Sequence, residues 1–414
     1  MILNNASDVR RGTNLTEYVY RGSTLVWQRK HPHPHPDPYV PVPGERHYGV
    51  RFKGASFEYL YDAEGKVPAS VSSLNGIVNL NGWSSAFFVR NNYPCMLTFD
   101  GYEEYKLNPY DHRYRIDGEL SDYNNLNFPG NAMSCFNCPI WLKFYKDSDD
   151  YFCIEVADSQ LDSDFVNYPY IRADESTSER MYYPMYTGTL DTEGRLRSIG
   201  VGTVRGTTST YANLVQAAEN NGDRWQINSF AFKLWINVLL FLMFNGDSVI
   251  NKTGRASFDN YQNGTSYDRG QFNYLYSGNT SSAHKTFFCE WLWGGRYSLY
   301  RTHDVLNGLY YKSISESGMW RNHIFYKMHP PYSVDGDLQT YQSVIADVNK
   351  FELDKSYGIL PNELGSTNQI KPFGSSGSFL AGLVYPYKQD NAENHCLYFG
   401  IDAYDTVTSS VYYV

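Results

Sequence analysis

The chain has 414 residues, 42% of them hydrophobic and 19% charged, so it can bury more than one core and its composition excludes a disordered protein. The net charge is −9 and no Lys/Arg-rich run occurs, which argues against nucleic acid as the main partner because phosphate binding needs a basic surface. The N-terminal residues lack the apolar stretch of a secretory signal, so we expect no export signal.

Residues 1–30 predict a small β anchor. They contain two extended pieces, around Gly12 and Gly22, and end in a tryptophan-containing run. So few strands have no second layer to pack on, and they cannot bury a core alone. We therefore expect this segment to dock on a larger assembly.

Residues 31–46 predict a stiff linker. Their sequence begins HPHPHPDPYVPVP, with proline at every second position from Pro32 to Pro38. Proline at this spacing excludes both a helix and a central strand. The segment is typical of an extended, polyproline-type spacer between an anchor and a larger body.

Residues 47–170 predict a β-rich domain. Aromatic and β-branched runs alternate there with clusters of Gly, Asn and Asp. The last two runs, separated by KDSDD, predict a hairpin with a polar loop. The expected strands are His47–Phe52, Ser84–Arg90, Met96–Phe99, Ile140–Tyr145 and Tyr151–Val156.

Residues 171–414 predict two helices followed by irregular β structure, so the whole chain reads as α+β. The first helix is expected to begin near Ser209 or Thr210 and to stop at residues 220–222, which read NNG. The second is expected to span Phe230–Phe244, before the stop residues Asn245 and Gly246. It is apolar nearly all round, which predicts a central, buried helix, and it is too short for a membrane span.

The six cysteines do not predict a metal or redox site. Cys135 and Cys138 form the single C-x-x-C pair, and no second pair follows at zinc spacing. A redox C-x-x-C opens a helix, whereas this one precedes the strand-like run PIWLKFY. We expect buried, reduced thiols in a protein assembled in a cytoplasm.

Enzymatic motifs and metal loops are not apparent either. The sequence has no G-x-S-x-G, P-loop or H-E-x-x-H motif, so we expect no enzyme, no catalytic residue and no cofactor. Asp147, Asp149 and Asp150 lack the Gly and the distal Glu of an EF-hand loop, and a solvated turn is expected there.

Several segments together resemble one family. VYRGSTLVW resembles particle-attachment segments of phage fibres. The block from MYTGTLDTEGRLRSIG to FLMFNGDSVIN, with KTFFCEWLWGG, YGILPNELGSTNQ and FGSSGSFLAGLVYPY, resembles phage tail-fibre and receptor-binding virion proteins. Their C-terminal domain is C-type-lectin-like, an architecture shared with the formylglycine-generating enzyme. The chain has no Trp-Asn-Asp or Glu-Pro-Asn calcium motif, so calcium-dependent sugar binding is not expected.

This resemblance implies a C-type-lectin-like receptor-binding domain over residues 171–414, a homotrimer, and ligand binding by the final strands. Tyrosine suits such a surface because it offers rigid, amphipathic contact area. The opposing interpretation is a final hairpin whose tyrosines cap the core. The candidate residues are Tyr385, Tyr387, Lys388, Asp390, Asn391, Asn394, His395, Tyr398, Asp402, Tyr404, Asp405, Tyr412 and Tyr413.

Two other features carry alternative interpretations. In phage fibres, His-x-His pairs from three chains sometimes hold an axial iron, and His31, His33 and His35 resemble such a run; a solvated linker is the simpler interpretation. Trp291 and Trp293 are candidates for a sugar platform, but a core plug is the preferred interpretation.

The sequence therefore predicts a bacteriophage virion adhesin, assembled in the host cytoplasm. Residues 1–30 would bind other virion proteins, and the C-terminal strands would bind a cell-surface glycan or protein, with no nucleic acid and no membrane insertion. Two alternatives stay open. One is a purely structural virion protein of the capsid or tail. The other is a surface-glycan hydrolase, because the sequence alone does not show whether two carboxylates are paired in space.

Overall fold

The computed structural model describes residues 38–53, 56–72, 76–167, 170, 177–201, 216–222, 224–227, 230–245, 263–273 and 285–290. It also describes the backbone of the short strands before residue 29 and after residue 297. Within these residues the content is mixed: sheets predominate and helices are few. The predicted α+β class is confirmed at that level.

A four-stranded antiparallel sheet forms the first layer. Its strand order is β12 (Trp141–Lys146), β13 (Phe152–Ala157), β5 (His47–Lys53) and β6 (Ser56–Tyr61). Alternate residues of β5 and β13 are large and apolar, and they are buried on one face. The predicted hairpin is confirmed, since Lys146 pairs with Phe152 across the KDSDD loop.

A six-stranded antiparallel sheet forms the second layer. Its strand order is β10 (Glu103–Lys106), β9 (Asn92–Thr98), β11 (Gly130–Phe136), β14 (Met181–Pro184), β28 (Val411–Tyr413) and β17 (Trp225–Ile227). Three of these strands precede residue 170 and three follow it. Consequently, the segments 47–170 and 171–414 share one sheet.

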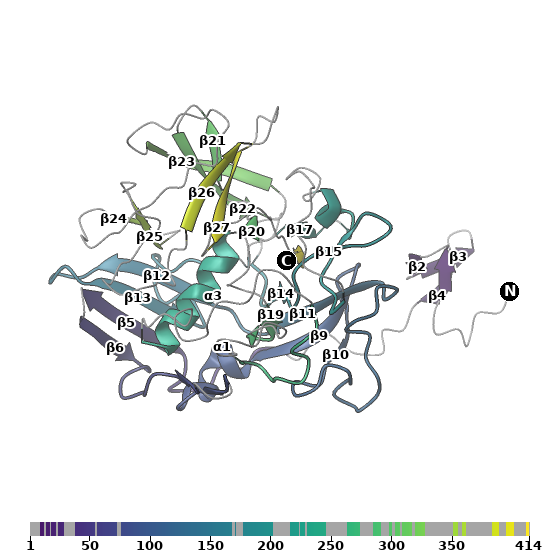
Figure 1. Cartoon of the computed structure of the whole chain (residues 1–414), viewed down its shortest axis with the longest axis horizontal. Coiled ribbons are helices and arrows are strands. Elements are labelled where there is room, and N and C mark those ends of the chain that lie inside the picture. Colours follow the sequence, from purple (N-terminus) through teal and green to yellow (C-terminus); the bar gives the residue numbers. More distant parts are fainter. Residues whose placement is uncertain are drawn as a thin grey trace.

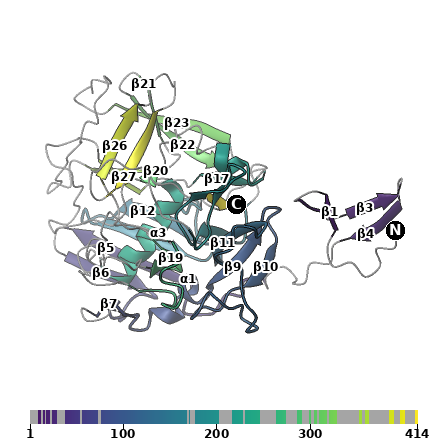
Figure 2. The ribbon, with the colours of Figure 1, turned by 45° about the vertical axis from the view of Figure 1, so that its right-hand side comes forward.

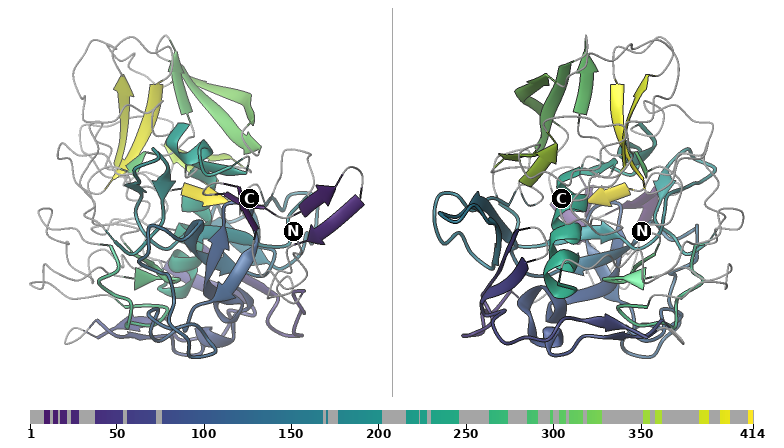
Figure 3. Two further views of the ribbon diagram at one scale, coloured as in Figure 1. Left: turned by 90° about the vertical axis from the view of Figure 1, so that its right-hand side faces the viewer. Right: turned by 60° about the vertical axis from the view of Figure 1, so that its left-hand side comes forward.

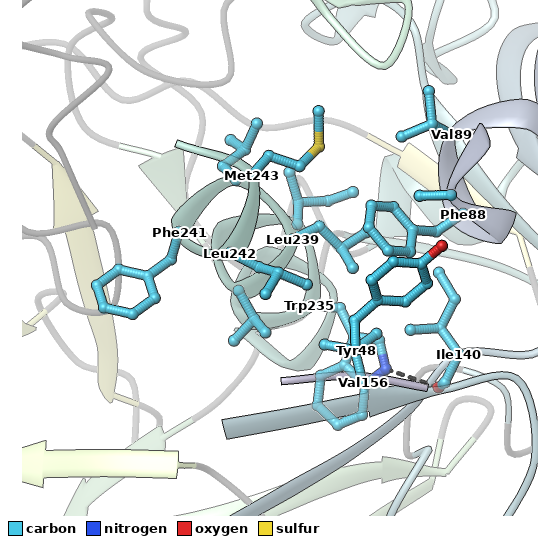
Figure 4. Close-up of a cluster of buried hydrophobic side chains, with 14 of the residues drawn as sticks. Tyr48, Phe88, Val89, Ile140, Val156, Trp235, Leu239, Phe241, Leu242 and Met243 are labelled. Atoms are coloured by element: carbon cyan, nitrogen blue, oxygen red, sulfur yellow. Dashed lines mark hydrogen bonds between the residues drawn. The ribbon is translucent and has the colours of Figure 1, made fainter. Parts of the chain in front are cut away.

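The helix α3 (Phe230–Met243) lies in the core between the two sheets (Figures 1 and 4). Its residues from Trp235 to Met243 that the structure describes are almost fully buried. They belong to one apolar cluster with Tyr48 and Val156 of the four-stranded sheet and Phe136 of the six-stranded sheet. The predicted central helix is confirmed, and within the described residues no helix is both long and apolar enough to cross a bilayer.

Smaller elements complete the described structure. A helical segment at 216–219 ends at the predicted stop, where Gly222 has φ 139°. The remaining helices and strands are β1 (Val9–Arg11), β2 (Asn14–Thr16), β3 (Tyr18–Arg21), β4 (Thr24–Gln28), β7 (Ser70–Val71), β8 (Val78–Asn79), η1 (Trp83–Ser85), α1 (Phe87–Arg90), β15 (Thr189–Leu190), β16 (Leu196–Arg197), β18 (Lys285–Thr286), β19 (Cys289–Glu290), β20 (Ser298–Leu299), β21 (His303–Leu306), β22 (Leu309–Glu316), β23 (Met319–Lys327), β24 (Phe351–Asp354), β25 (Gly358–Pro361), β26 (Leu383–Lys388) and β27 (His395–Gly400).

The ends of the chain are arranged differently. β1 pairs with β2 and β3 with β4, and neither hairpin pairs with another described strand. Both hairpins are drawn apart from the body (Figure 2). The sheets β20-β27-β26 and β21-β22-β23 lie together at one end of the body, on the side away from α1 (Figure 1).

The strand predicted over Ser84–Arg90 is wrong. This segment forms η1 and α1 instead, and Phe87, Phe88 and Val89 are all buried. A strand would turn every second residue of this apolar run away from the core, whereas one helical turn buries all three. Tertiary packing therefore overrides the β preference of the aromatic residues.

Residues 38–46, the described part of the predicted linker, contain neither helix nor strand, as expected. Their path is fixed by Asp158, which is 4% exposed. Its carboxylate accepts hydrogen bonds from Tyr39 Oη at 2.7 Å and from Arg46 Nε and Nη2. Residues 38–46 are thus attached to the body by charge-assisted hydrogen bonds from Tyr39 and Arg46 to Asp158.

Replacing Trp235 by Phe is expected to lower the free energy of unfolding by about 2 kcal/mol. Trp235 Nε1 donates to Ile140 O at 3.0 Å, so the change leaves a buried carbonyl without its donor and opens a small cavity. Urea unfolding followed by circular dichroism measures the loss. Val67→Ala, at a side chain that is 59% exposed, is the control and should change stability by less than about 0.5 kcal/mol. An unchanged midpoint for Trp235→Phe contradicts the central role of α3.

Candidate functional site

The predicted receptor-binding residues fall partly on the hairpin β26–β27. Tyr385 pairs with Tyr398, and Lys388 pairs with His395. Since residues alternate between the two faces of a strand, this register assigns Tyr385, Tyr387 and Tyr398 to one face and Lys388 and His395 to the other. The register therefore assigns three tyrosine positions, on two strands, to the same face of the hairpin.

The last two predicted residues lie elsewhere. Tyr412 and Tyr413 belong to β28, an interior strand of the six-stranded sheet that pairs with β17 and β14. The predicted face thus divides between two sheets. The other candidates, Asp390, Asn391, Asn394, Asp402, Tyr404 and Asp405, lie outside the described residues, as do Trp291, Trp293, His31, His33 and His35.

A second surface, which the sequence analysis did not single out, lies on the four-stranded sheet opposite α3. We call it the outer face and define it by His47, Arg51, Tyr61, Lys143, Tyr145 and Glu155. The alternation of polar and apolar residues along β5 and β12 is the sequence signal for its orientation. Nothing in that alternation indicated that the side chains converge on one carboxylate.

Glu155 is the centre of the outer face. Its Oε2 lies 2.8 Å from His47 Nε2, its Oε1 accepts from Tyr61 Oη at 2.9 Å, and Tyr145 forms a third hydrogen bond. The side chains of the flanking strands cover it, so Glu155 is only 4% exposed. Burial alone would raise the pKa of this carboxyl, but the bonds from His47, Tyr145 and Tyr61 outweigh it and hold the pKa below its ordinary value.

The aromatic rings of this surface are held in place by their neighbours. Tyr61 stacks on His47 with ring centroids 3.7 Å apart and an interplanar angle of 20°. Tyr61 also approaches Gly49, where an added Cβ would lie 3.0 Å from the tyrosine ring. Glycine at this position therefore leaves the space that the ring occupies.

No protein-family model, curated protein or solved structure matches this chain.

A buried polar cluster lies where β18 and β19 meet the segment 263–273. Lys285 pairs with Glu290, and both are almost fully buried. Lys285 Nζ donates to Ser266 O, while Glu290 accepts from the backbone N–H groups of Gly264 and Ser266 at 2.8 and 2.9 Å. Burial lowers the pKa of Lys285 to about 8 and raises the pKa of Glu290.

This cluster holds the segment 263–273 against the body. Phe287 and Phe288, in the tight turn between β18 and β19, have φ 48° and 63°. Phe287 is buried in the core around α3 and Phe288 in a second core around Met96. Both buried side chains are hydrogen-bonded to the backbone of the segment 263–273, so the arrangement is suited to a structural role that connects the two cores.

Metal and thiol chemistry find no support in the described part of the chain. No group of three or more His, Cys, Asp or Glu side chains is placed there to hold a metal ion. Cys95, Cys135, Cys138 and Cys153 are free and buried, and Cys289 is buried, as predicted. Burial raises the pKa of the Cys135 and Cys138 thiols, which disfavours the reactive thiolate. Asp147 accepts from the N–H groups of Asp149 and Tyr151, which is a hydrogen-bonded turn.

The stability of the protein is expected to fall as the pH drops below about 6.5, because of His112. This side chain is fully buried, its Nε2 has no hydrogen-bond partner, and desolvation, aided by the charge of Lys285, holds its pKa well below the ordinary 6.5. In that range the unfolded chain gains a proton that the folded protein does not take up, so folding becomes less favourable at each lower pH.

Between pH 7 and pH 5 this group alone should remove about 2 kcal/mol, measured by urea unfolding at both pH values. In the variant His112→Gln, which does not titrate, the stability difference between the two pH values should shrink by that amount. An equal pH dependence in the two proteins would show that His112 titrates normally when folded.

Proposed function

We propose that the chain is a bacteriophage adhesin that binds a host cell-surface receptor through its C-terminal hairpin. The observation that carries the proposal is the register of β26–β27, which assigns Tyr385, Tyr387 and Tyr398 to one face. Tyrosine gives large, rigid contact area with a hydrogen-bonding hydroxyl, at a low cost in conformational entropy. A cluster of three is the kind of surface that recognises a glycan or a protein loop.

The organisation of the N-terminal part supports the same role. Hairpins that pair only with themselves are suited to attach to another virion protein, and the proline-rich linker separates them from the body. In this proposal residues 1–30 attach to the particle and residues 31–46 set the distance to the body. Residues 171–414 contribute the C-type-lectin-like part of that body and share the six-stranded sheet with residues 47–170. The adhesin is a homotrimer, since three linked copies raise the effective concentration of a weak single site.

The purified full chain is expected to bind the bacterium on which the virus grows and to compete with the virus for adsorption. Tyr387→Ala combined with Tyr398→Ala should weaken cell binding at least about tenfold, which corresponds to about 1.4 kcal/mol. Binding of fluorescently labelled protein to cells, measured by flow cytometry, gives the affinity. Circular dichroism verifies that each variant is folded.

The matched control removes an exposed tyrosine outside the predicted receptor-binding residues. Tyr110→Ala, at a side chain that is 78% exposed, should leave cell binding within about twofold of the original. No adsorption block by saturating protein contradicts the adhesin and favours a structural virion protein. Loss of surface polysaccharide on incubation with the protein favours a glycan hydrolase.

A further inference from the structure

We propose that the outer face is a second binding site, for an uncharged saccharide, separate from the C-terminal hairpin. The observation behind it is the convergence of His47, Tyr61 and Tyr145 on the buried carboxylate of Glu155. This site does not depend on the adhesin proposal, because it is built from other strands and its binding is measured without cells.

The first argument is the preorganised ring. A sugar presents C–H groups on one side and hydroxyls around its edge, so it is recognised by an aromatic surface next to polar groups. Tyr61 provides such a surface: it is 43% exposed although it stacks on His47 and hydrogen-bonds Glu155. The ring is already fixed before a ligand arrives, which reduces the entropy lost on binding.

The second argument is the backbone of Tyr61. Its φ is 59°, in the left-handed region that a bulky aromatic residue rarely adopts. Such a conformation is unfavourable by itself and persists where surrounding contacts impose it, often at binding sites. Here the conformation brings the ring over Gly49 and within reach of Glu155, where a regular strand residue would not lie.

The third argument is charge. The cations of the outer face are already paired: Arg51 Nε lies 2.7 Å from Glu58 Oε2, and Lys143 Nζ lies 2.6 Å from Asp162 Oδ2. The carboxylate of Glu155 is buried and hydrogen-bonded to His47 and Tyr61. A surface whose charges are compensated within the protein has no excess charge for a polyanion, so it favours a neutral ligand rich in hydroxyls.

The fourth argument is access. α3 packs on the opposite face of the four-stranded sheet (Figure 3, right). On the outer face Phe165 packs against His47 and Lys143, whereas the side chain of Tyr61 is 43% exposed. Tyr145 and Lys143 are half-buried, with their polar ends beside Glu155 and Asp162. The exposed ring of Tyr61 is therefore the part of the outer face that a sugar unit can reach.

The test uses the full chain on an array of immobilised oligosaccharides that contains neutral hexose, hexosamine and uronic acid sequences. The protein should bind neutral members, and its signal should change little between low and high salt. Tyr61→Asn should weaken binding roughly tenfold. Asparagine tolerates the left-handed backbone, so this change removes the ring without forcing the strand to rearrange.

Two further variants test whether binding occurs at the outer face. Lys143→Ala should also weaken array binding, whereas Tyr110→Ala, at an exposed tyrosine in another part of the molecule, should not. Absence of binding to any array member, or equal binding by Tyr61→Asn, overturns the proposal. Binding limited to uronic acids and lost in salt overturns the neutral class. The double variant Tyr387→Ala, Tyr398→Ala should bind the array as well as the original protein does. Array binding therefore tests the outer face even if the hairpin does not bind cells.

Discussion

The arrangement of the body depends on burying α3. This helix is apolar nearly all round, and Trp235, Ile236 and residues 238–243 are buried, so both sheets turn an apolar face towards it. Tyr48, Phe52 and Val156 meet it from the four-stranded sheet, and Phe136 and Tyr183 from the six-stranded sheet. Trp235 Nε1 is the one strong side-chain donor in the described buried part of α3. It donates to Ile140 O, so the buried indole N–H is hydrogen-bonded.

This constraint also decides which surfaces are left for recognition. Once one face of the four-stranded sheet packs on α3, the period of two along β5, β12 and β13 sends the intervening residues outward. Glu155 lies on β13, one of the two inner strands of the sheet, where the neighbouring side chains bury it. An isolated carboxylate there would be costly, and the three side-chain donors are what make it tolerable.

Buried charge is used again to join distant segments. Arg197 is fully buried and donates to Asp191, Leu126 O and Phe128 O, while Lys285 and Glu290 bind the segment 263–273. Such groups contribute little net stability compared with apolar residues, but breaking one pair is costly. They therefore help to fix the position of these segments. The turn of Phe287 and Phe288 adds two rings, one to each core.

The sequence by itself determined the α+β composition, the position of α3, the KDSDD hairpin and the buried thiols, because periodicity and local stop signals are written in consecutive residues. The tertiary structure alone decided that Ser84–Arg90 is helical and that Phe287 and Phe288 take a turn that local preference assigns to Asn and Gly. It alone brought His47, Tyr61, Tyr145 and Glu155 together, and divided the predicted C-terminal face between β26–β27 and β28. These outcomes depend on contacts between residues far apart in the chain, which no local pattern records.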